Sequence, residues 1–153
     1  KIIPVKGRGA WMDPGPLGTL GVGMPFAIAA KLANPDRAVV IIYGDGSFGF
    51  NGMEFDTAVR FGLPIIGVVG NDAAWGQMMR PQGTLYGWDR LEGVLLERTR
   101  YDKVVEALGG HGEHVTEPGQ LRAALDRCVE SGKPSLVNVE IRQDRDYKGG
   151  IYV

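Results

Sequence analysis

The pattern of apolar residues along the chain predicts three β-strands. Residues 39–43 and 65–69 are short, unbroken runs of mainly β-branched side chains, which is typical of strands covered on both faces in a parallel sheet. We therefore expect these two runs to be the central strands. Residues 136–141 instead alternate between apolar and polar side chains, which indicates a strand nearer an edge of the sheet.

Between these runs, apolar residues recur at the spacing of an amphipathic helix. This periodicity predicts helices at residues 55–59, 101–108 and 121–129. Residues 21–32 are apolar and alanine-rich on almost every side, so we expect a helix that is buried nearly all round. Strands and helices that alternate in this way predict an α/β fold, with a mainly parallel sheet and helices on both of its faces.

Composition narrows the class of protein. The 153 residues, of which 44% are hydrophobic, are enough for one core and one domain. Lysine and arginine total 17 against 18 acidic residues, so charge gives no support for a nucleic-acid or membrane partner. The single cysteine, Cys128, lies among apolar residues at helical spacing, which predicts a packed thiol. With no apolar stretch of membrane-spanning length, we expect a soluble, cytoplasmic protein.

Two polar turns follow the two predicted central strands. A Gly-Asp-Gly run centred on Asp45 follows the first strand, and the pair Asn71-Asp72 follows the second. The helix predicted between them makes this segment a βαβ unit, whose right-handed crossover brings both turns to the same edge of the sheet. Ligands of open α/β sheets bind at that edge.

The residues in these turns suit a metal bound to a phosphate group. Glycines beside Asp45 let the backbone turn sharply, and the amides of Gly46 and Ser47 can face an anion. Carboxylates such as Asp45 and Asp72 are hard oxygen ligands, which suit Mg²⁺ bridged to phosphate oxygens. Taken singly, each turn also fits an ordinary loop, and we expect Asp45 at a solvent-facing strand end. A dinucleotide fold is disfavoured because no Gly-x-Gly-x-x-Gly opens a helix after the first clear strand.

The two turns together resemble the signature of thiamine diphosphate enzymes, in which Gly-Asp-Gly is followed by Asn-Asn. Here 24 residues separate the Gly-Asp-Gly run from Asn71-Asp72. Residues 11–21 also resemble the glycine-rich segment at the aminopyrimidine pocket of the acetolactate synthase, oxalyl-CoA decarboxylase and 2-hydroxyacyl-CoA lyase group. The resemblance implies thiamine diphosphate and Mg²⁺ as cofactors. It also implies that residues 1–153 form the C-terminal cofactor-binding domain of a longer enzyme.

The resemblance assigns roles to individual residues. It implies that Asp45 and Asp72 bind Mg²⁺ through their side chains and that Ala74 binds it through its carbonyl. The implied cofactor-binding set is Gly18, Leu20, Gly44, Asp45, Gly46, Ser47, Asp72, Ala74, Gly76, Gln77 and Met78. Within this set, Leu20 is expected beneath the bent cofactor, and Met78 is expected to approach its thiazolium ring.

Departures from the commoner family pattern point to one branch of the group. Asp72 stands where Asn is more usual, which adds a negative charge at the proposed metal. Trp75, Gln77, Met78 and Pro81 look more like the acetolactate synthase-like lyases that cleave 2-hydroxyacyl-CoA. The resemblance therefore predicts a lyase that releases formyl-CoA and an aldehyde or ketone. The alternatives are an acetolactate synthase large subunit, an oxalyl-CoA-type decarboxylase, and a non-catalytic cofactor-binding module.

The catalytic glutamate of this group is expected outside the chain. In the family it belongs to a pyrimidine-binding domain, usually on a neighbouring subunit, and nothing in this sequence resembles that domain. We therefore expect no catalytic side chain here, and we expect the remaining domains as partners in a homodimer or homotetramer. A CoA thioester is the expected substrate, and the basic residues within 142–153 are candidates for contacting its phosphates.

Three other polar residues receive structural interpretations. Glu54 begins a predicted helix, where an acidic side chain interacts favourably with the helix dipole. His111 and His114 follow two glycines, which predicts a surface loop.

Overall fold

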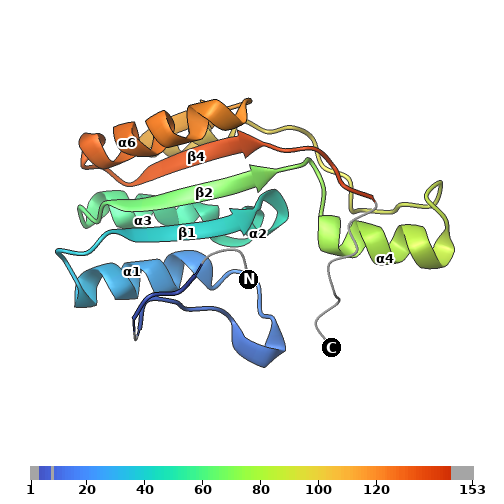
Figure 1. Ribbon diagram of the computed structural model, residues 1–153, viewed down its shortest axis with the longest axis horizontal. Helices are drawn as coiled ribbons and strands as arrows, with labels where there is room; N and C mark the ends of the chain where they lie inside the picture. Colours follow the sequence, from blue (N-terminus) through green and yellow to red (C-terminus); the bar gives the residue numbers. More distant parts are fainter. Residues whose placement is uncertain (1–3, 8, 146–153) are drawn as a thin grey trace.

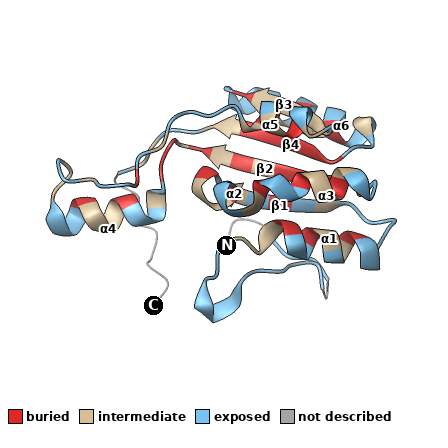
Figure 2. Ribbon diagram, turned by 180° about the vertical axis from the view of Figure 1, so that it is seen from behind, coloured by how far each residue is buried: buried red, intermediate tan, exposed pale blue. Residues whose placement is uncertain are grey.

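The computed structural model describes residues 4–7 and 9–145 of the chain. Its elements are η1 (Gly15–Leu17), α1 (Gly23–Ala33), β1 (Val39–Gly44), α2 (Asp45–Asn51), η2 (Gly52–Glu54), α3 (Phe55–Arg60), β2 (Ile65–Asn71), α4 (Gly76–Tyr86), α5 (Tyr101–Ala107), β3 (His111–Val115), η3 (Pro118–Gln120), α6 (Leu121–Ser131) and β4 (Ser135–Glu140). All pairs of these strands are parallel, in the order β1-β2-β4-β3. Figure 1 shows β1, β2 and β4 side by side, and Figure 2 labels β3 as well. The predicted α/β fold is therefore confirmed.

The positions of individual strands differ from the prediction. β2 is central as expected, but β1 lies at an edge of the described sheet, and β4 is central rather than near an edge. The prediction placed β4 near an edge because it took Asn138 for a solvent-facing residue. Asn138 is in fact 1% exposed, and hydrogen bonds rather than apolar contacts surround it. The fourth strand, β3, occupies residues that were predicted to be a loop.

Helices cover the two faces of the sheet unequally. One face packs against α1, α2, α3 and α5 through a core that includes Met24, Phe55 and Leu136. The other face packs against α6, where Ala124 and Cys128 contact strand residues such as Val137. Cys128 is 1% exposed, as its pattern predicted. In Figure 2 the buried residues concentrate in the two central strands, β2 and β4.

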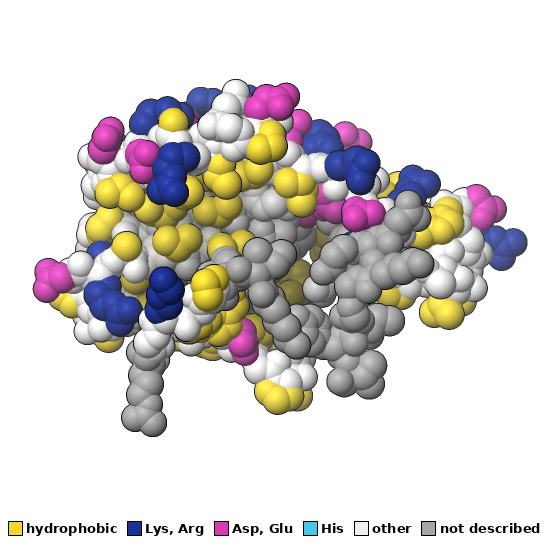
Figure 3. Space-filling model, viewed as in Figure 1, with side chains coloured by type: hydrophobic (Ala, Val, Ile, Leu, Met, Phe, Trp, Pro, Cys, Tyr) yellow, Lys and Arg dark blue, Asp and Glu magenta, His cyan; other side chains and the backbone are white. Residues whose placement is uncertain are grey.

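Part of the second face is bare at β1. Val40 and Ile42 are 51% and 60% exposed, and hydrophobic side chains gather on the near face of the molecule in Figure 3. α1 is also less buried than predicted, since Phe26 and Leu32 are 37% and 61% exposed while Met24 faces the core. The expectation of full burial was wrong here because helices and strands of the described chain cover only one side of each element.

α4 stands apart from the sheet, beyond the carboxyl ends of the strands (Figure 1). It is anchored by a small core of its own, in which Met79 packs with Ala74 and Val94. Trp88 and Leu91 pack against that core from the segment after the helix. None of the helices in the described part of the chain is both long and apolar enough to cross a membrane.

Candidate cofactor site

Strand register brings the two polar turns together. β1 and β2 pair in parallel with Gly44 opposite Gly70. The next residues are Asp45, which begins α2, and Asn71, which ends β2. The βαβ argument from sequence is therefore confirmed for the placement of the two turns at one sheet edge.

Asp45 is buried rather than solvent-facing, which corrects the sequence-based expectation. Its side chain is 1% exposed. The backbone N–H of Gly46 donates to Oδ1 at 2.7 Å, and the N–H of Ala74 donates to Oδ2 at 3.2 Å. Asp45 thus joins the two turns directly, and the Gly46 amide serves the carboxylate rather than standing free for an anion.

Burial makes the charge on Asp45 unfavourable. It raises the pKa of the Asp45 carboxyl, and the negative charge of Asp72 raises this pKa further, against the lowering effect of the backbone hydrogen bonds. Burial also raises the pKa of Asp72, although the nearby guanidinium groups of Arg80 and Arg98 act in the opposite direction. A cation bound between these carboxylates would relieve the desolvation and the repulsion together.

The donor set fits Mg²⁺ held jointly with a phosphate group. Within residues 4–7 and 9–145, no group of three or more His, Cys, Asp or Glu side chains is placed to hold a metal ion. Two carboxylates with a backbone carbonyl leave positions for phosphate oxygens and water, which is the usual environment of protein-bound Mg²⁺. The described part of the chain therefore supplies only some of the ligands of such a metal.

The second turn is held in an unusual backbone conformation. Ala73 has a φ of 56°, in the left-handed region that non-glycine residues seldom adopt. Its carbonyl accepts hydrogen bonds from the backbone N–H of Leu96 at 2.8 Å and from the side chain of Gln143 at 3.2 Å. The N–H of Trp75 donates to the carbonyl of Val94 at 2.8 Å. These contacts clamp the turn from two later segments of the chain, which supports the conformation of Ala73.

Gly46 is required where the two turns touch. A Cβ atom at this position would lie 2.5 Å from Cδ1 of the Trp75 indole. The indole also packs against Phe50, whose ring centroid is 5.8 Å from that of Trp75. Any side chain at position 46 would therefore push Trp75 away from the turn that carries Asp45.

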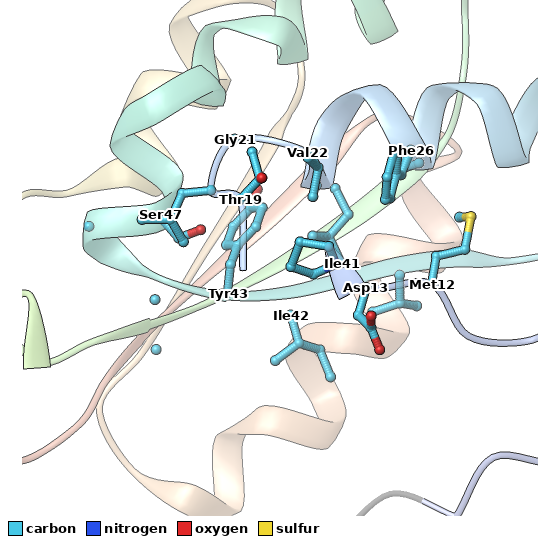
Figure 4. A pocket seen from close by; sticks show the side chains of 18 of the residues that line it. Met12, Asp13, Thr19, Gly21, Val22, Phe26, Ile41, Ile42, Tyr43 and Ser47 are labelled. Carbon is cyan, nitrogen blue, oxygen red and sulfur yellow. The ribbon is translucent and has the colours of Figure 1, made fainter. Parts of the chain in front are cut away.

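A cleft of about 810 Å³ opens beside both turns. Every residue of the predicted cofactor-binding set lines it except Gly18, which ends η1 in a left-handed conformation at φ 59°. Leu20 and Met78 are 50% and 51% exposed, so both apolar side chains are available to a ligand. Figure 4 shows Ser47 on the same cleft as Thr19 and Gly21 of the glycine-rich segment. The roles assigned to single residues of the set stay predictions.

The remaining polar candidates have partners within the fold. Glu54 lies in η2 and accepts a hydrogen bond from the Thr57 hydroxyl at 2.6 Å. His111 and His114 belong to β3, which contradicts the predicted loop, and they lie 2.9 Å from Glu113 and Glu140. β3 was not predicted because its polar side chains pair with each other and with β4, so the strand lacks the alternation of apolar and polar residues that usually identifies a strand.

The structure describes only residues 142–145 of the basic segment 142–153. Arg142 and Arg145 are exposed, and the Arg145 guanidinium lies 5.3 Å from the centre of the Trp88 ring. The rest of this segment, residues 146–153, lies outside the described residues, so its predicted contact with CoA phosphates stays a prediction.

Sequence reasoning missed a cluster of buried polar side chains next to the turn that follows β2, which we call the metal turn. Asn71, Asp102 and Asn138 are each 1% exposed and are connected by hydrogen bonds. The one available signal was Asn138 within an otherwise apolar run, which was interpreted as the polar face of an edge strand. Asn138 is buried because β4 lies between β2 and β3.

Comparison with known proteins agrees with the geometry. Residues 1–139 match the family described as "Thiamine pyrophosphate enzyme, C-terminal TPP binding domain". The chain belongs to this family. The structure is also similar to a Rhodococcus jostii RHA1 thiamine diphosphate-dependent 4-hydroxybenzoylformate decarboxylase, with a TM-score of 0.76 and 25% identity over 85% of this chain and 24% of that one.

Curated relatives of this TPP-binding domain include an acetolactate synthase and 2-hydroxyacyl-CoA lyases. An acetolactate synthase large subunit of Mycobacterium tuberculosis is 52% identical over 131 residues, or 86% of this chain. The 2-hydroxyacyl-CoA lyase 2 of Caenorhabditis elegans is 44% identical over 158 aligned residues, and the human protein of that name is 38% identical over 155, covering 99% and 97% of this chain. The chain spans 24% of the length of each of these three relatives.

Proposed function

We propose that this domain holds thiamine diphosphate through Mg²⁺ and serves a longer enzyme that cleaves a 2-hydroxyacyl-CoA to formyl-CoA and an aldehyde or ketone. The observation that carries the metal assignment is the buried Asp45 carboxylate. Its pKa is raised by burial and by the charge of Asp72, so it lies where a cation would be stabilising. Membership of the TPP-binding family supports the cofactor.

The proposed roles of the residues follow from where they lie. Asp45 and Asp72 would bind the metal by their carboxylates, and the carbonyl of Ala74 would complete the protein ligands. Leu20 and Met78 would hold the cofactor rings by apolar contact, because both are half exposed on the cleft. When bound, thiamine diphosphate supplies the carbanion chemistry that breaks or forms a bond beside a carbonyl carbon.

The preference for a lyase rests on the reach of the similarity. The nematode and human lyases align over 99% and 97% of this chain, whereas the synthase relative aligns over 86%. The lyase of Xenopus laevis aligns over 71%. The basic residues of the segment after β4 are the proposed contact for CoA phosphates, and Arg142 is exposed there. We also propose that the remaining domains supply the catalytic glutamate, in a cytoplasmic homodimer or homotetramer.

Acetolactate synthase is the second candidate function. It is favoured by the higher identity of the synthase relative, 52% over 131 residues. In this role the same metal and cofactor site would serve the condensation of two 2-oxo acids, without any need for contacts to CoA.

A direct competition decides between the two functions. The complete protein, loaded with thiamine diphosphate and Mg²⁺, is given a 2-hydroxyacyl-CoA and pyruvate together, and products are identified by mass. We expect formyl-CoA with an aldehyde or ketone to dominate, and we expect residues 1–153 alone to turn over neither substrate. Acetolactate as the main product, with no CoA thioester cleaved, would favour the synthase.

A further inference from the structure

A series of buried hydrogen bonds, called the hydrogen-bond chain below, connects α5 to the metal turn after β2. Asn138 of β4 donates from Nδ2 to Oδ1 of Asp102 at 3.2 Å and to the carbonyl of Thr99 at 3.2 Å. Asn71, at the end of β2, donates from Nδ2 to Oδ1 of Asn138 at 3.1 Å and to the same Thr99 carbonyl at 3.0 Å. Finally, Oδ1 of Asn71 accepts the backbone N–H of Ala73 at 3.2 Å.

The hydrogen-bond chain has a fixed direction. An ionised carboxylate can only accept, so Asp102 fixes the amide nitrogen of Asn138 toward itself and leaves the Asn138 oxygen facing Asn71. That oxygen requires the amide nitrogen of Asn71, which leaves the Asn71 oxygen facing the turn. If either amide were rotated by 180°, two oxygens or two N–H groups would face each other within a buried site.

Arg100 keeps the start of the hydrogen-bond chain ionised. Its guanidinium makes two hydrogen bonds to the Asp102 carboxylate, at 2.9 and 2.6 Å. Burial alone would raise the pKa of Asp102, but the hydrogen bonds from Arg100 and Asn138 and the charge of Arg100 hold this pKa below its usual value. Asp102 is therefore an acceptor throughout the physiological range of pH.

The end of the hydrogen-bond chain lies against the candidate metal ligands. Ala73 adopts a left-handed conformation, and its N–H is held by Asn71. The next residue, Ala74, donates its N–H to Asp45 at 3.2 Å, and its carbonyl is the proposed backbone ligand. The orientation of the Asn71 amide therefore helps set the backbone of the turn that carries Asp72 and Ala74.

We propose that Asn138 is a positioning residue for the metal: through the amide of Asn71 it holds the turn in the shape that binds Mg²⁺. This inference rests on the proposed metal and cofactor function. Asn138 touches neither of the candidate ligands Asp45 and Asp72, and it acts by fixing which end of the Asn71 amide faces the turn. Outer partners of metal ligands commonly affect metal affinity by about 10-fold to 100-fold.

The test compares two substitutions on the same strand. Asn138→Ala removes the amide near the metal edge. Ser135→Ala is the matched control, because Ser135 is 0% exposed and hydrogen-bonded, through its hydroxyl, at the opposite end of β4. In the complete protein, Mg²⁺ is titrated at fixed thiamine diphosphate and followed by tryptophan fluorescence, since Trp11 and Trp75 line the cleft. The thermal midpoint without ligands is measured in parallel.

We expect both substitutions to lower the thermal midpoint, but only Asn138→Ala to raise the apparent Kd for Mg²⁺, by about tenfold. A second pair covers the case in which Asn138→Ala does not fold. Asp102→Ala should weaken Mg²⁺ binding by a smaller factor, and Asp102→Asn should restore it, because an amide oxygen can still accept from Asn138.

Specific results would overturn the inference. An unchanged Mg²⁺ affinity in Asn138→Ala, or an equal loss in Ser135→Ala, would show that the network stabilises the fold without positioning the metal. Equal affinities in Asp102→Ala and Asp102→Asn would do the same. If the unsubstituted protein itself gave no Mg²⁺-dependent signal with thiamine diphosphate, the proposed function and this inference would fail together, which separates that outcome from the others.

Discussion

Two carboxylates are buried to the same degree in this domain but have opposite surroundings. Asp45 begins α2 and Asp102 lies in α5, and each is 1% exposed. Asp102 lies 2.6 Å from the Arg100 guanidinium, and its pKa is lowered. Asp45 accepts backbone hydrogen bonds but makes no ion pair among the described residues, and burial raises its pKa. The fold thus supplies a cation to one carboxylate and not to the other.

This difference separates a structural charge from a binding charge. A buried charge that is paired within the fold contributes to the native state with nothing further bound. A buried charge without a counter-ion favours binding of a cation from outside, which is the arrangement expected at a metal site. Tyr43 adds a third kind of group, since its buried hydroxyl has no hydrogen-bond partner among the described residues and lies near Gly67 in the apolar core.

The largest expected effect comes from removing the unpaired carboxylate. Asp45→Ala should weaken Mg²⁺-dependent binding of thiamine diphosphate by more than the roughly 10- to 100-fold typical of outer partners, because a direct ligand is lost. The metal-free fold should change little, since losing two backbone hydrogen bonds is offset by removing a buried charge. Calorimetry with and without Mg²⁺ measures this, with Asp56→Ala, a half-exposed carboxylate of α3, as the control. Full Mg²⁺ dependence in the variant would remove Asp45 from the metal site.

Breaking the paired carboxylate should affect stability. Arg100→Ala should lower the free energy of unfolding at pH 7 by about 1–3 kcal/mol, because Asp102 becomes a buried charge without its counter-ion while Arg100 is partly exposed. The folded pKa of Asp102 is lowered from 3.8, so this contribution is present above pH 3.8 and is lost as pH falls through the folded value.

Urea unfolding at neutral and acidic pH tests this dependence. Arg60→Ala, which breaks an exposed i,i+4 pair with Asp56, should cost about 0.5 kcal/mol or less and serves as the control. An Arg100→Ala effect no larger than the control, or one that grows on acidification, would contradict the account of Asp102.

Removing the unpartnered hydroxyl of Tyr43 should stabilise the protein. Tyr43→Phe removes the unpartnered hydroxyl and should raise the free energy of unfolding by about 0.5–1 kcal/mol. Burial raises the pKa of Tyr43, so the hydroxyl stays neutral and the gain should not vary between pH 5 and pH 8. Thermal unfolding measures the change. A loss of stability would indicate that the hydroxyl has a partner, such as a buried water molecule.

The smallest effect is expected at the second candidate ligand. Asp72→Asn should retain Mg²⁺-dependent binding, because an amide oxygen can replace the carboxylate. The metal-free protein should gain a few tenths of a kcal/mol, roughly, at pH 7. Since the folded pKa of Asp72 is raised above 3.8, this gain should be full above the folded value and vanish as pH falls below 3.8. Complete loss of cofactor binding would mean that the carboxylate itself is needed.

The arrangement of the site was predictable, but the support behind it was not. The handedness of a βαβ unit places Asp45 and Asn71 at one edge whatever the side chains do. In contrast, the Ala74 amide binds the Asp45 carboxylate and the Trp75 indole packs against Gly46, and these contacts join positions about 30 residues apart. Such contacts are a property of the packed turns and leave no periodic pattern.

Strand position was harder to predict for a physical reason. Val40 and Ile42 are apolar on a face that the described chain does not cover, so β1 has the sequence of a central strand at an edge position. Asn138 has the opposite character, since hydrogen bonds rather than apolar contacts make its burial favourable. Alternating polarity predicts which face of a strand is exposed only if the polar side chains face water. The prediction fails where they face other polar side chains inside the protein.

The bare edge of β1 bears on how the domain behaves at high concentration. No described strand pairs with its outer side, so a row of backbone N–H and C=O groups lies next to the exposed side chains of Val40 and Ile42. Neither proline nor lysine interrupts this strand, and unprotected edges of this kind promote pairing between copies of a chain. Preparations of residues 1–153 alone should therefore lose colloidal stability as they are concentrated, starting from this strand.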